Sequence, residues 1–124
     1  MGADFKIVKE QPAGRNNVVV YHLAGWLDAQ SEQQVVNAIQ QAKDDGKDFV
    51  LLDLKDVDTI TSAGIRAMQK GFQLLTPKAD TYKVAHLKLC NAPAQIYQVL
   101  SITGILMNVP MFENQDDAVE SFGK

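Results

Sequence analysis

Apolar residues occur along this chain in short continuous runs, separated by segments in which they are spaced differently. Runs of this length that are rich in β-branched residues and bounded by Gly, Pro, Asn or Asp are typical of β-strands. We expect strands at Phe5–Glu10, Val18–Ala24, Phe49–Leu54, Tyr82–Leu89 and Leu106–Phe112. Phe49–Leu54 is nearly all apolar, as in a central strand that is covered on both faces. Pro110 places the last strand at an edge of the sheet.

Between these runs, apolar residues recur three and four positions apart, which is the spacing of one face of an α-helix. The first helix is expected to begin at Ser31, which would form a capping box with Gln34, and to stop at Gly46. The others are expected from Ser62 to about Leu75, from a cap at Asn91 with Pro93 in the first position to Gly104, and from Asn114 to about Phe122.

Strands and helices alternate from Val18 onward, and crossover helices of this kind imply a mainly parallel sheet with right-handed connections. We therefore expect residues 1–124 to form one α/β domain, with a four- to five-stranded sheet and about four flanking helices. Loops that follow successive parallel strands emerge at one edge, which usually carries function. If the second and third strands are neighbours, the segments Gly25–Gln30 and Asp56–Ser62 form one surface.

Composition narrows the classes of function. The net charge is −3, and the twelve basic residues are scattered, which gives no support for nucleic-acid binding or for a polybasic membrane anchor. Cys90 is the only cysteine, so no internal disulfide and no Cys-based metal site can form. No apolar run approaches the length of a membrane span, and no signal-peptide core is present. These features predict a soluble cytoplasmic protein.

Ser62 stands where the second long helix is expected to begin. A serine at this position can simply cap the helix, or it can carry a phosphate, because a helix N-terminus presents N–H donors and the positive end of the dipole. Thr61 offers a second hydroxyl and could itself be the cap. Gly64 is unusual in a first helical turn and would allow either a partner or another backbone to approach closely, with tight packing on the sheet as the alternative.

Two residues of the loop after the second strand are further candidates. Asp28 could orient a hydroxyl or contact a basic group of a partner, and a local Asx turn is the alternative. Trp26 is the only tryptophan, and it is either an exposed anchor for a partner or a ring folded back onto the sheet edge. The candidate partner-binding residues are therefore Trp26, Asp28, Thr61, Ser62 and Gly64.

Catalytic and metal-binding arrangements are weakly indicated. Asp53, Asp56 and Asp58 do not have the spacing of an EF-hand loop, and we interpret them as a solvated acidic turn. His22 and His86 fall within expected strands without a second metal-type ligand, which favours structural roles. A serine hydrolase would need one of these histidines beside Ser62, and no GxSxG, HExxH or phosphate-binding glycine motif occurs. We expect no enzymatic activity and no metal site.

Three segments resemble the STAS domains, and specifically the stand-alone bacterial anti-sigma-factor antagonists. LAGWLDAQ at Leu23–Gln30 is similar to the family's L-x-G-x-L-D segment, and VLLDLKDVDTITSAGIRAM at Val50–Met68 is similar to its signature around D-S-x-G. NAPAQIYQVLSITGI at Asn91–Ile105 is similar to the family's late helix. The resemblance covers nearly the whole chain, and the middle segment is the most specific.

The resemblance implies partner switching. Ser62 matches the serine that is phosphorylated by a kinase of the histidine-kinase-like ATPase type, which is also the anti-sigma factor, and Asp28 matches the family's loop aspartate. The unphosphorylated antagonist binds the anti-sigma factor, phosphorylation releases it, and a separate phosphatase restores it. ATP would belong to the kinase, so no cofactor is implied for this chain.

Thr61 departs from the family pattern, which usually has Asp before the switch serine. Three interpretations stay open: a different partner, a modification shared with Thr61, or a non-switching STAS domain. The alternative function is accordingly a STAS scaffold or adaptor subunit of a signalling or lipid-transport assembly, without phosphorylation.

Overall fold

The computed structural model describes residues 4–76 and 85–122, and its strands form one sheet in the order β1-β2-β3-β4-β5. The strands are β1 (Lys6–Glu10), β2 (Val18–Leu27), β3 (Phe49–Ile60), β4 (Leu87–Cys90) and β5 (Met111–Phe112). β1 is antiparallel to β2, and the other neighbours are parallel. The predicted α/β class, the mainly parallel sheet and the neighbouring position of the second and third strands are confirmed.

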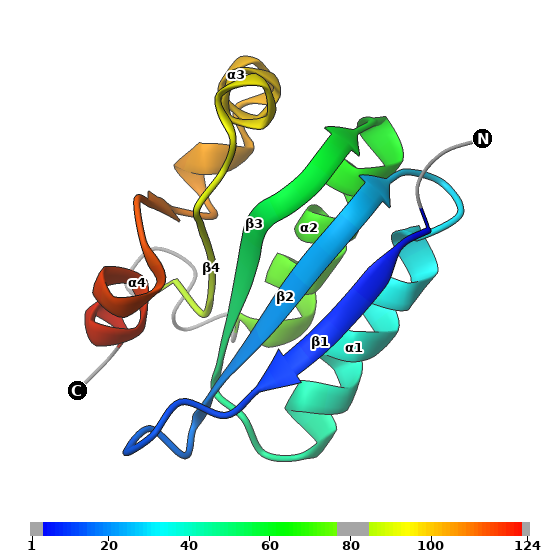
Figure 1. Cartoon of the computed structure of the whole chain (residues 1–124). Coiled ribbons are helices and arrows are strands. Elements are labelled where there is room, and N and C mark those ends of the chain that lie inside the picture. The colour runs from blue at the N-terminus through cyan, green and yellow to red at the C-terminus, as the bar shows by residue number, and fades with distance from the viewer. Residues whose placement is uncertain (1–3, 77–84, 123–124) are drawn as a thin grey trace.

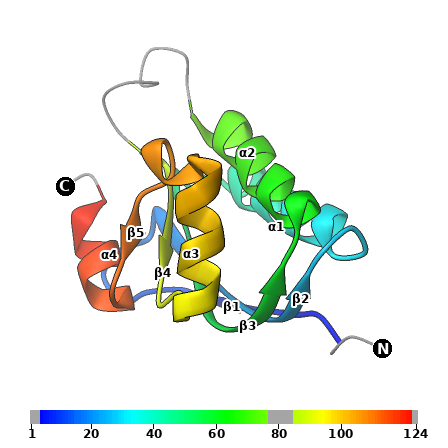
Figure 2. The ribbon, with the colours of Figure 1, turned by 90° about the horizontal axis from the view of Figure 1, so that it is seen from above.

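Helices cover the two faces of this sheet unequally (Figures 1 and 2). The helices are α1 (Glu32–Asp44), α2 (Ser62–Leu75), α3 (Ala94–Thr103), the short 3₁₀ helix η2 (Ile105–Met107) and α4 (Gln115–Ser121). α1, α2 and α3 contribute to one hydrophobic core, whereas α4 packs on the opposite face. In the described part of the chain, no helix is long and apolar enough to span a bilayer.

The apolar runs of β2 and β3 are buried because both faces of these strands are covered. Val19 and Leu52 belong to the core under α1, α2 and α3, and Val20 and Leu51 belong to the smaller core under α4. The predicted inner faces of the helices are also present: Val35 and Ile39 of α1, for example, are buried. Because both faces of β2 and β3 are buried, these are the central strands of the sheet, and their ends hold the loops that follow them in place.

β3 is longer than predicted. The segment that contains Asp56 and Asp58 is not a turn, because it continues the parallel pairing with β2 as far as Ile60. Two register shifts interrupt this pairing, between His22 and Ala24 and between Gly25 and Trp26 on β2. The interpretation of a solvated acidic turn was therefore wrong in its secondary structure, and also wrong for Asp53, which is buried. Asp56 and Asp58 are exposed, as expected.

The last third of the chain departs most from prediction. The expected strand Leu106–Phe112 is mostly wrong, because η2 occupies Ile105–Met107 and only Met111–Phe112 pair with β4. This short strand does lie at the sheet edge, as Pro110 indicated. Residues 82–84 of the expected strand Tyr82–Leu89 lie outside the described residues. Gly104 ends α3 in the left-handed conformation (φ 78°), as predicted.

Asn91 does not cap α3, which contradicts the prediction. Its backbone is left-handed (φ 59°), and its side-chain amide donates to Asp53 at 3.1 Å. Pro93 occupies the capping position, one residue before the helix. Asn114, in contrast, caps α4 as predicted, since its side chain accepts from the backbone N–H of Asp117 at 2.8 Å.

Candidate functional site at the ends of β2 and β3

The candidate site lies where β2 and β3 end together. Leu27 and Ile60, the last residues of the two strands, are paired, and the backbone N–H of Thr61 donates to the Leu27 carbonyl at 3.0 Å. The segments that follow are therefore held side by side, with the start of α2 next to the loop that leads into α1. The shared surface expected from strand order alone is confirmed.

Ser62 is the first residue of α2, and Thr61 is its N-cap residue. Both are exposed. Thr61 has an extended backbone (φ −111°, ψ 179°), but its side chain accepts no capping hydrogen bond. The alternative in which Thr61, rather than Ser62, occupies the cap position is therefore the correct one. Ser62 presents an accessible hydroxyl at the electropositive end of a fourteen-residue helix.

Gly64 is buried beneath the first turn of α2. A Cβ atom at this position would come within 2.6 Å of the Leu27 carbonyl oxygen and 2.7 Å of Ile60 Cγ1. Because Gly64 has no side chain, the backbone of β2 in the same chain can approach α2 closely at this point. Of the two roles considered for Gly64, the structure supports tight packing on the sheet. This packing fixes the position of the first turn of α2, which carries Ser62.

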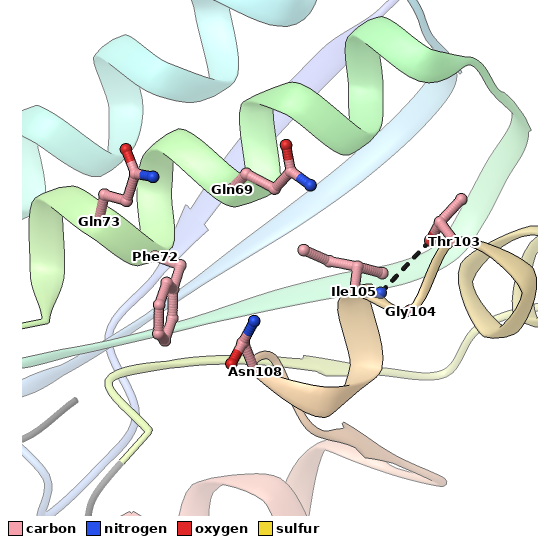
Figure 3. A pocket seen from close by; sticks show the side chains of 7 residues that line it. All are labelled: Gln69, Phe72, Gln73, Thr103, Gly104, Ile105 and Asn108. Carbon is pink, nitrogen blue, oxygen red and sulfur yellow. Dashed lines mark hydrogen bonds between the residues drawn. The ribbon is translucent and has the colours of Figure 1, made fainter. Parts of the chain in front are cut away.

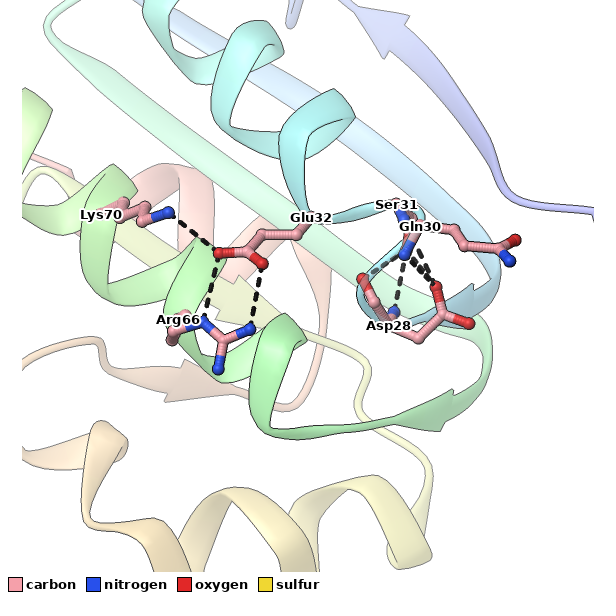
Figure 4. Close-up of polar contacts among 6 residues, drawn as sticks. All are labelled: Asp28, Gln30, Ser31, Glu32, Arg66 and Lys70. Carbon is pink, nitrogen blue, oxygen red and sulfur yellow. Dashed lines mark hydrogen bonds and ion pairs between the residues drawn. The ribbon is translucent and has the colours of Figure 1, made fainter.

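The loop between β2 and α1 is organised by Asp28 and Ser31 (Figure 4). The Asp28 carboxylate accepts from the backbone N–H groups of Gln30 at 3.0 Å and Ser31 at 3.3 Å, which is the Asx turn considered for it. The Ser31 hydroxyl is buried; it accepts from Asp28 N–H at 2.9 Å and donates to the Trp26 carbonyl at 2.8 Å.

The predicted capping box of Ser31 and Gln34 is therefore wrong. Ser31 has a helical backbone and makes no capping hydrogen bond, because its hydroxyl is used to close the loop behind it. The Asp28 carbonyl accepts from the N–H of Glu32 at 2.9 Å, so the turn at Asp28 leads directly into α1. Asp28 consequently has a structural role, and its carboxylate is held on the same edge as Ser62.

Trp26 belongs to the end of β2 rather than to a loop, which corrects the predicted limits of that strand. Trp26 is 39% exposed, as one of the exposed large hydrophobic residues, so the ring is not folded into the core. It pairs in register with Thr59 of β3. An amphipathic ring in this state offers apolar area to a partner at a low entropic cost.

An ion cluster that sequence reasoning did not identify joins α1 to the first turns of α2 (Figure 4). Glu32 accepts from Arg66 Nη2 at 3.2 Å and Nε at 3.4 Å, and from Lys70 Nζ at 3.0 Å. These hydrogen bonds lower the pKa of the Glu32 carboxyl. The i, i+4 spacing of Arg66 and Lys70 placed them on one face of α2, but only the packing of α1 against α2 could reveal their shared partner.

Neither histidine lies at this edge. Both ring nitrogens of His22 contact carboxylates, Nδ1 at 2.6 Å from Asp53 and Nε2 at 2.7 Å from Glu10. His86 stacks on Phe49, with ring centroids 4.9 Å apart. Phe49 begins β3, whereas Ser62 follows its last residue, roughly 35 Å further along the strand. The geometry therefore provides Ser62 with no histidine base.

Asp53 receives hydrogen bonds from several elements at the centre of the sheet. Besides His22, it accepts from the backbone N–H of Lys55 at 3.0 Å and from the Asn91 amide. Among the described residues, no three His, Cys, Asp or Glu side chains are placed to hold a metal ion. This group is thus a structural network rather than part of the candidate site.

A pocket of about 450 Å³ lies elsewhere, between α2 and the α3–η2 corner (Figure 3). It is lined by Gln69, Phe72, Gln73, Thr103, Gly104, Ile105 and Asn108. Sequence reasoning did not find it, because its walls come from distant segments and carry no motif. Ser62 and its neighbours do not line this pocket, so it is distinct from the candidate site.

Comparison with known proteins gives one consistent result. The family model of the STAS domain matches residues 11–118. The chain is 26% identical over 107 residues to the protein named "Putative anti-sigma factor antagonist BtrV" of Bordetella bronchiseptica, a match that covers 86% of this chain and 88% of that one.

Solved structures agree with this result at the level of the fold. An anti-sigma factor antagonist from Mycobacterium paratuberculosis superimposes with a TM-score of 0.79 at 18% identity, covering 95% and 93% of the two chains. SpoIIAA superimposes in its unphosphorylated form (TM-score 0.70, 18% identity, 94% and 93% covered) and, from Bacillus, in its phosphorylated form (0.64, 18%, 94% and 97%). The chain therefore belongs to the STAS domain family.

Proposed function

We propose that this protein is an anti-sigma-factor antagonist that acts by partner switching, with Ser62 as the phosphorylated residue. The observation that carries the proposal is the exposed Ser62 hydroxyl at the first position of α2, on the edge that also holds Asp28 and Trp26. The relatives described as antagonists, and the two phosphorylation forms in which SpoIIAA has been solved, support this assignment.

In the proposed switch, the unmodified edge binds an anti-sigma factor that is also a serine kinase of the histidine-kinase-like ATPase type. The Ser62 oxygen bonds to the γ-phosphorus of the ATP held by that kinase, ADP leaves, and the hydroxyl proton passes to a base of the kinase. The product gains roughly −1.5 to −2 charges at the interface, which releases the partner. A phosphatase then hydrolyses the ester and restores the serine.

The test compares binding of the candidate kinase to wild-type protein, Ser62→Asp and Ser101→Asp. Ser101 is an exposed serine near the far end of α3, so it controls for added charge away from the edge. We expect Ser62→Asp to weaken binding about tenfold or more, which corresponds to ~1.4 kcal/mol, and Ser101→Asp to bind normally. Equal affinities for all three proteins would contradict the switch.

A non-switching STAS scaffold or adaptor subunit is the second candidate, and Thr61 favours it, because the family's usual Asp is absent from the residue before Ser62. Incubation with the kinase and ATP, followed by intact and peptide mass spectrometry, separates the two. Modification of Ser62 supports the antagonist. Unmodified Ser62 and Thr61, with the partner still bound, support the scaffold.

A further inference from the structure

Arg66 lies one helical turn beyond Ser62 on α2, and residues four positions apart on a helix are surface neighbours. Side chains in a helix lean toward its N-terminus. The Arg66 side chain reaches across to Glu32 in this structure, and its N-terminal lean means that another rotamer would extend over the turn that carries Ser62. It is 53% exposed, and Ser62 is exposed as well. The guanidinium can thus reach a group attached to the Ser62 oxygen by a change of side-chain rotamer.

The ion cluster that holds Arg66 carries two positive charges and one negative charge. Two cations, Arg66 and Lys70, share the single carboxylate of Glu32, whose side chain is only 14% exposed. The Lys70 contact, at 3.0 Å, is shorter than either contact of Arg66. Glu32 would consequently keep a close cation if Arg66 turned away, which makes Arg66 the exchangeable member of the cluster.

The chemistry of the two anions favours such an exchange. A guanidinium presents paired N–H donors that match phosphate oxygens, and these charge-assisted hydrogen bonds are stronger with a dianion than with one carboxylate. A phosphate on Ser62 would meet no other cation of α2 as close in sequence, because Lys70 lies a further turn along the helix. The Asp28 carboxylate does not compete for Arg66, since it is held by its own Asx turn.

From this arrangement, and resting on the phosphorylation of Ser62 proposed above, we infer that Arg66 binds the phosphate in the modified state. The guanidinium leaves Glu32 and pairs with the phosphate on Ser62, while Lys70 alone keeps Glu32 neutralised. Phosphorylation then changes the surface in two ways. It adds a dianion at the start of α2, and it withdraws a cation that the unmodified edge offers to an acidic group of the partner.

The experiment installs phosphoserine at position 62 during translation, so that no kinase is needed, and follows its phosphorus resonance by NMR across pH. The second ionisation of a phosphoserine lies near pH 6. We expect the pKa of this phosphate to be lower in the wild-type background than in Arg66→Gln by roughly 0.15 to 0.35 units, the size of an i, i+4 charge pair.

Two further variants test the exchange itself. Glu32→Gln frees Arg66, so the phosphate pKa should be at or below the wild-type value. Lys70→Gln leaves Glu32 dependent on Arg66, so the two anions compete and the phosphate pKa should lie between those of wild type and Arg66→Gln. A melting curve for each variant confirms that it is folded, which the exposure of Arg66 and Lys70 favours.

Identical phosphate pKa values in wild type and Arg66→Gln would overturn the inference. It would also be overturned if the phosphate pKa were the same in wild type, Lys70→Gln and Glu32→Gln. Neither result bears on whether a kinase modifies Ser62, because the phosphate is installed without one. Conversely, absence of modification by the kinase would count against the proposed function and leave the pairing with Arg66 standing.

Discussion

The backbone of Gly64 rests directly against the carbonyl oxygen of Leu27, with no room for a Cβ atom between them. This contact sets how closely the first turn of α2 approaches the end of β2. The position of Ser62 above the sheet edge therefore depends on the absence of a side chain two residues later.

Gly64→Ala is expected to destabilise the protein. Alanine favours a helix by ~1 kcal/mol over glycine, but overpacking against fixed atoms costs ~1–3 kcal/mol, so we expect the free energy of unfolding, measured in urea, to fall by up to about 2 kcal/mol. Gly71→Ala is the matched control on the same helix, because its Cβ would meet the flexible end of Ile39. A loss at Gly71 as large as that at Gly64 would contradict this account.

Ser31→Ala is expected to lower the free energy of unfolding by about 1–3 kcal/mol, because it removes the buried hydroxyl that pairs with the part-buried N–H of Asp28 and carbonyl of Trp26. Gln34→Ala serves as the control. The capping box would make Gln34 important, whereas the structure leaves it exposed, so this variant should unfold within about 0.5 kcal/mol of wild type. Similar losses in both variants would restore the capping box.

The pairing of His22 with two carboxylates predicts a pH-dependent stability. Burial acts to lower the pKa of His22, but hydrogen bonds to Glu10 and Asp53 outweigh it, and the pKa lies above its ordinary value of 6.5. Because the folded pKa is the higher one, this stabilisation is complete below about pH 6.5 and is lost as pH rises through the folded pKa.

Urea unfolding of wild type and His22→Gln across pH 5.5 to 9 checks this prediction. The stability advantage of wild type over the variant should shrink as pH rises. Stability differences that stay flat, or that grow with pH, would show that His22 is not held in its charged form between Glu10 and Asp53.

Cys90 is expected to be unreactive in the folded protein. Burial, with a smaller contribution from the charge of Asp53, raises the pKa of its thiol to about 12, and only the thiolate is nucleophilic. An alkylating reagent at pH 8 should therefore label Cys90 in urea but not in buffer, as read by intact mass. Rapid labelling of the native protein, at a rate independent of urea, would contradict this expectation.

The parts of the fold that were predictable are those with repeated patterns. Val35 and Ile39 recur at helical spacing, and the apolar residues at the start of β3 are typical of a buried strand. The end of β3 was not predictable, because polar residues such as Asp56 and Asp58 are typical of a turn. They extend a strand only because β2 supplies hydrogen-bonding partners as far as Leu27, and one sequence does not show that pairing.

Competing local signals account for the other errors. Ser31 and Gln34 fit a capping box, but Asp28 stands three residues earlier and takes over the turn. The apolar stretch after Gly104 suits a strand or a short helix equally well, and packing selects η2.

Strand order alone was enough to place Asp28 and Ser62 on one edge. The link between Glu32 and Arg66 needed the packing angle of α1 on α2, which a single sequence does not carry.

Among the described residues, each strand from β2 to β5 pairs with the strand that precedes it in the chain. The ladder can thus be assembled in the order of synthesis, without waiting for a distant segment to return, which limits the exposure of unpaired edges. When α2 has emerged from the ribosome, β1, β2, α1 and β3 are already available to it. The edge that carries Asp28 and Ser62 can therefore take shape on a nascent chain before β4 is made.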